Sequence, residues 1–115
     1  MGAAALGDIG EMFPDTDEAN RGRDSADMLS QAVERVIAAH YTIGNLDCIV
    51  FAERPKLSTF KDAIRIRIAE IIGIHPTQVG VKAKTGEGIG GIGNEEIIAA
   101  QCVASLKPKL MCGGW

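Results

Sequence analysis

Apolar residues recur at helical spacing in two stretches of the chain. Between residues 25 and 40 they stand three or four positions apart, which predicts a helix capped by Asp24 or Ser25. A second helix is predicted to start at Ser58 or Thr59 and to end at Gly73, a suitable C-cap residue. Its expected buried face consists of Phe60, Ala63, Ile64, Ile68, Ile71 and Ile72, and its expected exposed positions are Lys61, Arg65 and Glu70.

Shorter apolar runs predict strands. Residues 46–52 follow Gly44-Asn45 and precede Pro55, and residues 79–83 follow a turn at His75-Pro76. Residues 95–106 suit a helix or a strand, and propensity slightly favours a helix. The expected fold class is therefore α/β (α+β), a single domain over residues 1–106 with helices packed on one face of the sheet, followed by an irregular tail at 107–115.

The N-terminal part is dominated by turn-forming residues. Residues 1–7 end at a glycine and resemble the last turn of a helix, and residues 8–24 are rich in Gly, Pro, Asn and Asp. This composition predicts a long loop.

Composition and charge exclude several classes of partner. The chain has 115 residues, 12 Lys+Arg against 15 Asp+Glu and a net charge of −3, which argues against duplex nucleic acid and anionic membranes. It contains no apolar run of the roughly 18 residues that a membrane-spanning helix needs, and no signal-peptide pattern, so we expect a cytoplasmic protein. Three cysteines without a short spacing indicate reduced thiols rather than disulfides or a Cys/His zinc site.

A strand and a glycine-rich loop together form the strongest chemical signal. Residues 82–88 bring two lysines and the hydroxyl of Thr85 to glycines whose N–H groups can approach an anion, as in a phosphate site. The alternative is a flexible connection with solvated lysines. The glycines also match a dinucleotide-binding string, but too little chain follows for a Rossmann unit, and no glycine directly precedes Lys84 as a Walker A loop requires.

Carboxylates form a second group of candidates. Asp8, Asp15 and Asp17 could accept sugar hydroxyls or hold a cation, although aspartates in turns more often act as caps. Glu87, between Lys84 and the glycines, could bind a Mg²⁺ that is otherwise held by phosphates.

The end of the first strand offers backbone groups. Because Arg54-Pro55-Lys56 stops the strand, the polar groups at Ala52 and Glu53 are expected to stay free to contact a base. The alternative is an ordinary strand end. The histidines have simpler interpretations: His40 ends a helix and His75 belongs to a turn.

Several motifs together resemble the 2-C-methyl-D-erythritol 2,4-cyclodiphosphate synthase family of the non-mevalonate isoprenoid pathway. They are Leu6-Gly7-Asp8-Ile9-Gly10, residues 13–17, Gly44-Asn45-Leu46-Asp47, residues 52–56 and residues 81–90. The resemblance extends from Gly2 to about Leu106. It implies a homotrimer with active sites between subunits, and a strand rather than a helix over residues 97–106.

The resemblance also implies a reaction and a set of site residues. The enzyme, a phosphorus-oxygen lyase, would convert 4-CDP-2-C-methyl-D-erythritol 2-phosphate to the cyclic diphosphate and release CMP. Thr85 would stabilise the transition state, and Glu87 would hold Mg²⁺ or Mn²⁺ with the diphosphate. The substrate-binding residues would be Asp8, Ile9, Gly10, Phe13, Pro14, Asp15, Thr16, Asp17, Ala52, Glu53, Arg54, Pro55, Lys56, Leu57, Ser58, Lys84, Thr85, Gly86 and Glu87.

The sequence departs from the family at both ends. The family's zinc-binding Asp-x-His and histidine segments have no counterpart here, so no zinc site is expected in this chain. Asn94 and Glu95 stand where the family commonly has Arg-Gly. We therefore expect weak binding of CMP or CDP with Mg²⁺ and negligible turnover. The alternative is a non-catalytic remnant that trimerises or binds a nucleotide or partner.

Overall fold

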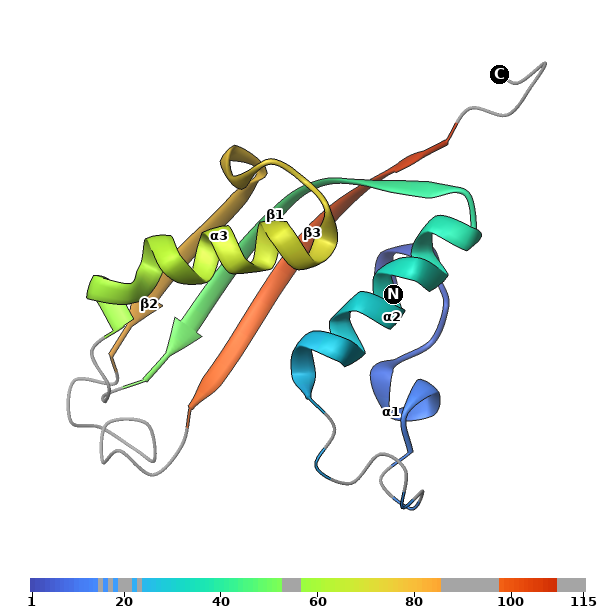
Figure 1. Cartoon of the computed structure of the whole chain (residues 1–115), viewed down its shortest axis with the longest axis horizontal. Helices are drawn as coiled ribbons and strands as arrows, with labels where there is room; N and C mark the ends of the chain where they lie inside the picture. The colour runs from blue at the N-terminus through green and yellow to red at the C-terminus, as the bar shows by residue number, and fades with distance from the viewer. Residues whose placement is uncertain are drawn as a thin grey trace. The chain divides into compact units, whose positions relative to one another are not determined.

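The computed structural model describes residues 1–14, 16, 18, 22, 24–52, 57–85 and 98–109 (Figure 1). Its helices and strands are α1 (Ile9–Met12), α2 (Ser25–Ala38), β1 (Tyr41–Phe51), α3 (Lys61–Ile72), β2 (Val79–Lys84) and β3 (Ala99–Pro108). Three 3-10 turns complete the described elements: η1 (Gly2–Ala4), η3 (Leu57–Phe60) and η4 (Pro76–Gln78). The contacts divide the chain into a helical unit, Met1–Gly44 with Ser105–Trp115, and a sheet unit, Asn45–Ala104.

A mixed three-stranded sheet in the order β2-β1-β3 is the framework of the fold. β1 and β2 are parallel, with Leu46 opposite Val79 and Phe51 opposite Lys84. Cys48 meets Cys102, and Gly44 lies against Ser105, so residue numbers on β3 fall as those on β1 rise and the two strands are antiparallel. The mixed α/β class expected from the sequence is confirmed.

Helix α3 connects the two parallel strands and packs against β2 in the sheet unit. Residues of β2 alternate in burial, so that Val79, Val81 and Ala83 share the more buried face and Lys82 and Lys84 the exposed one. Buried residues of the helix and the strand include Ala69 at 1% exposure, Val79 at 3% and Ile72 at 8%. The helix that connects the parallel strands therefore also covers the buried face of β2.

The predicted orientation of α3 needs correction. Phe60 is 52% exposed, whereas the Arg65 side chain is only 30% exposed because its Nη1 donates a 2.8 Å hydrogen bond to the Pro76 carbonyl. The start also differs: the 3-10 turn η3 precedes the helix, and the N-cap residue is Phe60, without a side-chain cap. The predicted C-cap is confirmed, because Gly73 adopts φ +83° and its amide donates to the Ala69 carbonyl.

The helical unit contains α2, as the apolar spacing predicted. Asp24 caps it, with its Oδ1 accepting a 2.9 Å hydrogen bond from the Ala26 amide, and Ala32, Val33 and Val36 are buried. The helix ends at Ala38, two residues before the expected end. In addition, the loop expected over residues 8–24 contains the short helix α1, capped by Asp8.

Strand boundaries also depart from the expectations. β1 begins at Tyr41 rather than Leu46, so Gly44 and Asn45 lie within the strand rather than before it. The last element is strand β3, as the family resemblance implied and against the propensity preference, and it continues to Pro108, into the expected tail. Its end is held beside the start of β1, because the Lys109 amide donates a 2.7 Å hydrogen bond to the His40 carbonyl.

Among the described residues, no helix is long and apolar enough to cross a membrane.

Candidate nucleotide site

A cavity of about 220 Å³ lies where the parallel strands β1 and β2 end. It is lined by Ala52, Leu57, Ser58, Ala83, Lys84 and Thr85. Carboxyl ends of parallel strands are the usual place for ligands in α/β sheets, because the loops there leave backbone groups and side chains free to converge. Five of these six residues were predicted from the sequence, from two segments some 30 positions apart.

A backbone hydrogen bond fixes the two segments against each other. The Ala52 amide donates to the Lys84 carbonyl at 3.0 Å, and Ala52 itself is only 5% exposed. The sequence predicts free backbone polar groups at Ala52, and for the Ala52 amide this prediction is wrong. The parallel pairing of β1 with β2 continues one residue past the end of β1, and the Ala52 amide takes part in it.

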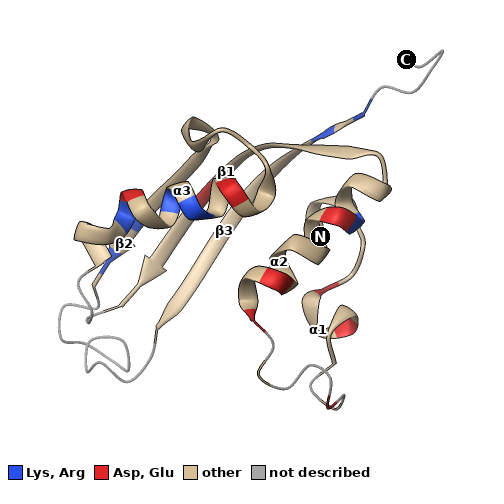
Figure 2. Ribbon diagram, viewed as in Figure 1, with Lys and Arg blue, Asp and Glu red and all other residues tan. Residues whose placement is uncertain are grey.

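The two lysines of β2 have different surroundings. Lys82 Nζ lies 3.2 Å from both carboxylate oxygens of Asp47 on the neighbouring strand, an exposed ion pair. Lys84 lines the cavity instead, and within the described ranges it forms no ion pair. Basic positions are visible on α3 and along β2 in Figure 2. Among the described residues that line the cavity, Lys84 is therefore the cation that can meet an anionic ligand.

The predicted residues of the helical unit lie around α1. Asp8 Oδ1 accepts a 2.8 Å hydrogen bond from the Glu11 amide, so the interpretation of this aspartate as a helix cap is confirmed. Ile9 and Gly10 belong to the helix and are exposed, as are Pro14 and Thr16. Phe13, at 8% exposure, is part of the apolar interior of this unit.

Eight predicted site residues lie outside the described part of the chain. They are Asp15, Asp17, Glu53, Arg54, Pro55, Lys56, Gly86 and Glu87. Glu87 is the proposed metal ligand. Among the described residues there is no group of three or more His, Cys, Asp or Glu side chains that could hold a metal ion.

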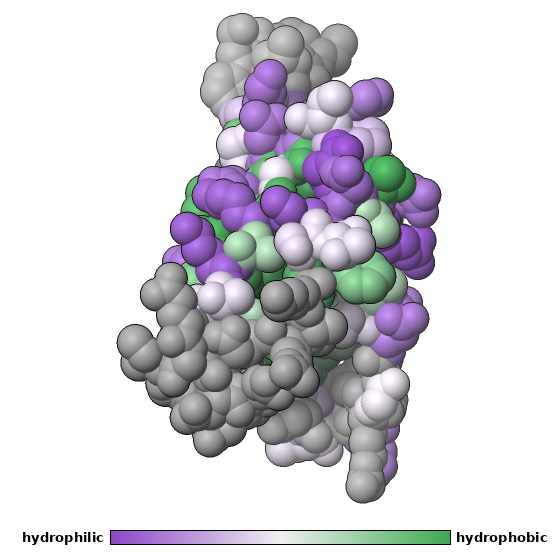
Figure 3. Space-filling model, turned by 90° about the vertical axis from the view of Figure 1, so that its left-hand side faces the viewer, coloured by the Kyte–Doolittle hydropathy of each residue, from purple (hydrophilic) through white to green (hydrophobic). Residues whose placement is uncertain are grey.

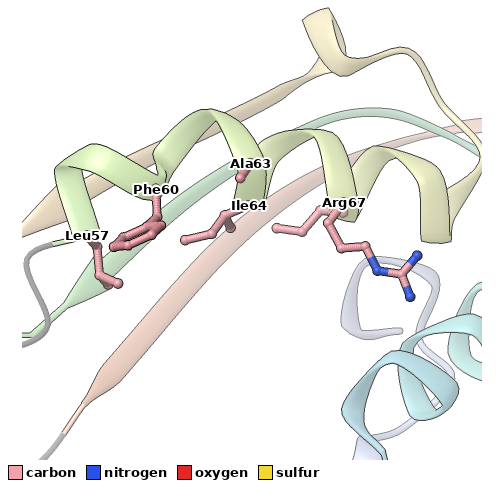
Figure 4. A pocket seen from close by; sticks show the side chains of 6 residues that line it. Leu57, Phe60, Ala63, Ile64 and Arg67 are labelled. Carbon is pink, nitrogen blue, oxygen red and sulfur yellow. The ribbon is translucent and has the colours of Figure 1, made fainter.

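A larger hollow of about 500 Å³ lies along α3 and is lined by Leu57, Phe60, Ala63, Ile64, Arg67 and Ile68. Most of these side chains are apolar, and Leu57, Phe60 and Ile64 gather at the start of the helix (Figure 4). Apolar side chains also interrupt the hydrophilic surface on the face shown in Figure 3. This hollow has no convergent polar groups, which makes the smaller cavity the better candidate for a polar ligand.

Ala83 lines the cavity but was not predicted as a site residue. The signal was present, since Ala83 follows Val79 and Val81 on the inward face of a strand with two-residue alternation. A small residue there leaves room beside Leu57 and Ser58.

The comparisons with known proteins identify the family. A profile of the YgbB family matches residues 1–107. The chain belongs to this family. Two similar proteins named 2-C-methyl-D-erythritol 2,4-cyclodiphosphate synthase come from Gemmatimonas aurantiaca, 49% identical over 92% of this chain and 64% of that protein, and Verminephrobacter eiseniae, 51% identical over 92% and 58%. The chain thus spans about two thirds or less of the length of these relatives.

Solved structures agree with this assignment. The chain resembles the bifunctional IspDF from Campylobacter jejuni with a TM-score of 0.89 and 39% identity, covering 93% of this chain and 29% of that one. It also resembles a CDP complex of IspF from Plasmodium falciparum, with a TM-score of 0.81 and 34% identity over 94% and 64% of the two chains.

Proposed function

We propose that this chain carries the CDP-binding part of a 2-C-methyl-D-erythritol 2,4-cyclodiphosphate synthase. The reaction would convert 4-CDP-2-C-methyl-D-erythritol 2-phosphate to the cyclic diphosphate with release of CMP. The observation that carries this proposal is the cavity at the ends of β1 and β2, which brings Ala52, Leu57 and Ser58 together with Lys84 and Thr85. Support also comes from relatives that bear the synthase name and from a similar structure described as a CDP complex.

The two walls of the cavity would bind different parts of the nucleotide. Residues 52–58 would enclose the cytosine, with Ala52 and Leu57 providing apolar contact and Ser58 a hydroxyl. Lys84 and Thr85 would hold phosphate oxygens, because an ammonium group and a hydroxyl can both donate to them. In the reaction Thr85 would stabilise the charge that develops on the transferred phosphate.

The remaining contacts of the substrate would come from residues 8–17. Asp8 and Gly10 would meet the ribose, and residues 13–17 the erythritol part. In this proposal the active site is assembled between neighbouring copies in a homotrimer. Glu87 would hold Mg²⁺ or Mn²⁺, which supplies charge neutralisation between the phosphates when it is bound.

Strand β3 supports self-association. It is an edge of the sheet, and most of its residues are exposed. Val103 is 68% exposed, and Ile98, just before the strand, is 63% exposed. An uncovered apolar edge strand is a liability that proteins normally cover, and the proposed trimer would cover it.

Titration calorimetry of the full chain with CDP and with ADP, each in Mg²⁺, tests the nucleotide proposal. We expect CDP to bind at least about tenfold more tightly, since only the cytosine fits the contacts at residues 52–58. Equal affinities would refute the base assignment. In that case the chain would bind the phosphates of either nucleotide, and only the proposed phosphate contacts of Lys84 and Thr85 would be retained.

A further inference from the structure

Two cysteine thiols meet between neighbouring strands of the sheet unit. Cys48 on β1 and Cys102 on β3 are free cysteines whose sulfur atoms lie 3.3 Å apart. They are 54 positions apart in the sequence, so the sheet, and not a local turn, brings them together. Neither residue lines the candidate nucleotide site.

The strand geometry suits a covalent link. Facing residues on antiparallel strands have Cα atoms about 4.5–5.5 Å apart, and disulfides form at Cα separations of about 4.4–6.8 Å. The sulfur atoms must approach to about 2.05 Å, which side-chain torsions and a small strand adjustment can supply. The fold therefore presents the pair without a rearrangement of the chain.

The two thiols differ in environment. Cys102 is exposed, whereas Cys48 is half-buried. Burial, followed by the hydrogen bond and charge of Cys102 and the charge of Asp47, raises the pKa of Cys48 to about 12. Because the thiolate is the attacking form, Cys102 is the thiol that reacts first with a reagent from solvent.

We propose that Cys48 and Cys102 form a reversible disulfide within one chain, with a low-molecular-weight disulfide such as oxidised glutathione as the oxidant. The Cys102 thiolate attacks one sulfur of glutathione disulfide, forms a mixed disulfide and releases one glutathione. Cys48 then loses its proton to solvent, attacks the Cys102 sulfur and releases the second glutathione. Two protein thiols are oxidised and one glutathione disulfide is reduced to two glutathione molecules, so the electrons balance.

The test uses the full chain with Cys112→Ser, which removes the third thiol of the sequence. The protein is incubated with glutathione disulfide at pH 8, alkylated under denaturing conditions and digested with trypsin. Cys48 falls in peptide 36–56 and Cys102 in peptide 85–109, so a link between them is read directly by mass. We expect the joined peptides and a chain that stays monomeric on a non-reducing denaturing gel. A link between two chains, or stable glutathione on both cysteines, would overturn the proposal.

Single variants test the order of the two steps. Cys48→Ser should accumulate glutathione on Cys102, since no second thiol can displace it. Cys102→Ser should lower the rate of the first reaction at least about tenfold, because only the half-buried thiol of Cys48 remains. Equal rates for the two variants would contradict the assigned roles. Circular dichroism of both variants checks that the fold is retained, and reduction with dithiothreitol should restore both thiols.

Discussion

The Ala52 amide and the Lys84 carbonyl are joined by a 3.0 Å hydrogen bond. This bond extends the parallel pairing of Phe51 with Lys84 by one residue. It holds the segment proposed to bind the base against the segment proposed to bind phosphate. The spacing between the two halves of the site is thus set by the pairing of two strands, a rigid element on which a site can be held precisely.

Replacement of Lys84 should weaken binding of CDP selectively. A hydrogen bond to a charged group contributes about 1.5–3 kcal/mol, so Lys84→Ala should raise the Kd for CDP by about 10- to 100-fold. The affinity for cytidine, which has no phosphate, should change little. Titration calorimetry with both ligands measures the difference.

Lys82→Ala is the matched control for this prediction. It removes the same charge two residues earlier on the same strand, where the ammonium group is paired with Asp47. The Kd for CDP should stay within about threefold of the parent value, since exposed ion pairs contribute little. A loss as large as that of Lys84→Ala would mean that general charge, and not a defined contact, binds the nucleotide.

The sequence was most informative where one local preference dominated. The short apolar run over residues 79–83, after the turn at His75-Pro76, predicted β2, and the spacing of apolar residues predicted α2. Strand β3 could not be assigned from propensity, because its small residues suit both states and only pairing with β1 decides between them. The prediction of the buried face of α3 was partly wrong for a related reason. Isoleucines occur all around this helix, and tertiary packing decides that Ala69 and Ile72 are the buried residues.

The site illustrates the same limit. Motifs placed Ser58 and Lys84 in one site, but the sequence alone did not show that the Ala52 amide would be used by the ladder. That bond depends on the register of two strands that are separated by a whole helix. Similarly, nothing local in the sequence pairs Cys48 with Cys102.

Gly73→Ala should destabilise the protein by about 1 kcal/mol. Gly73 has φ +83° at the end of α3, a conformation in which a Cβ is strained, while no atom within 4 Å would clash with it. Urea unfolding measures the change, with Gly2→Ala as control because Gly2 has the same open surroundings without a positive φ. An equal effect of the two variants would contradict the C-cap role.

Val103→Lys should shift the proposed trimer toward monomer. Val103 is 68% exposed on the edge strand that the proposed trimer would cover, and burial of a valine contributes about 1.5 kcal/mol per copy before the cost of a buried charge is added. Analytical ultracentrifugation measures the distribution. Ile66→Lys, on the exposed side of α3 at 43% exposure, is the control and should leave it unchanged. A parent chain that is monomeric at all concentrations would refute the trimer itself.

The raised pKa of Cys48 should make both its alkylation and the stability of the fold depend on pH above 9. Its pKa rises from 9.0 to about 12 on folding, mainly through burial. The folded state therefore holds the proton more tightly, and the stability gained is complete below pH 9 and is lost between about pH 9 and 12. With Cys112→Ser as background, the alkylation rate of peptide 36–56 should still be rising at pH 10. An alkylation midpoint near pH 9 would contradict the burial of this thiol. In Cys48→Ala, the free energy of unfolding should decline less steeply above pH 9 than in the parent protein.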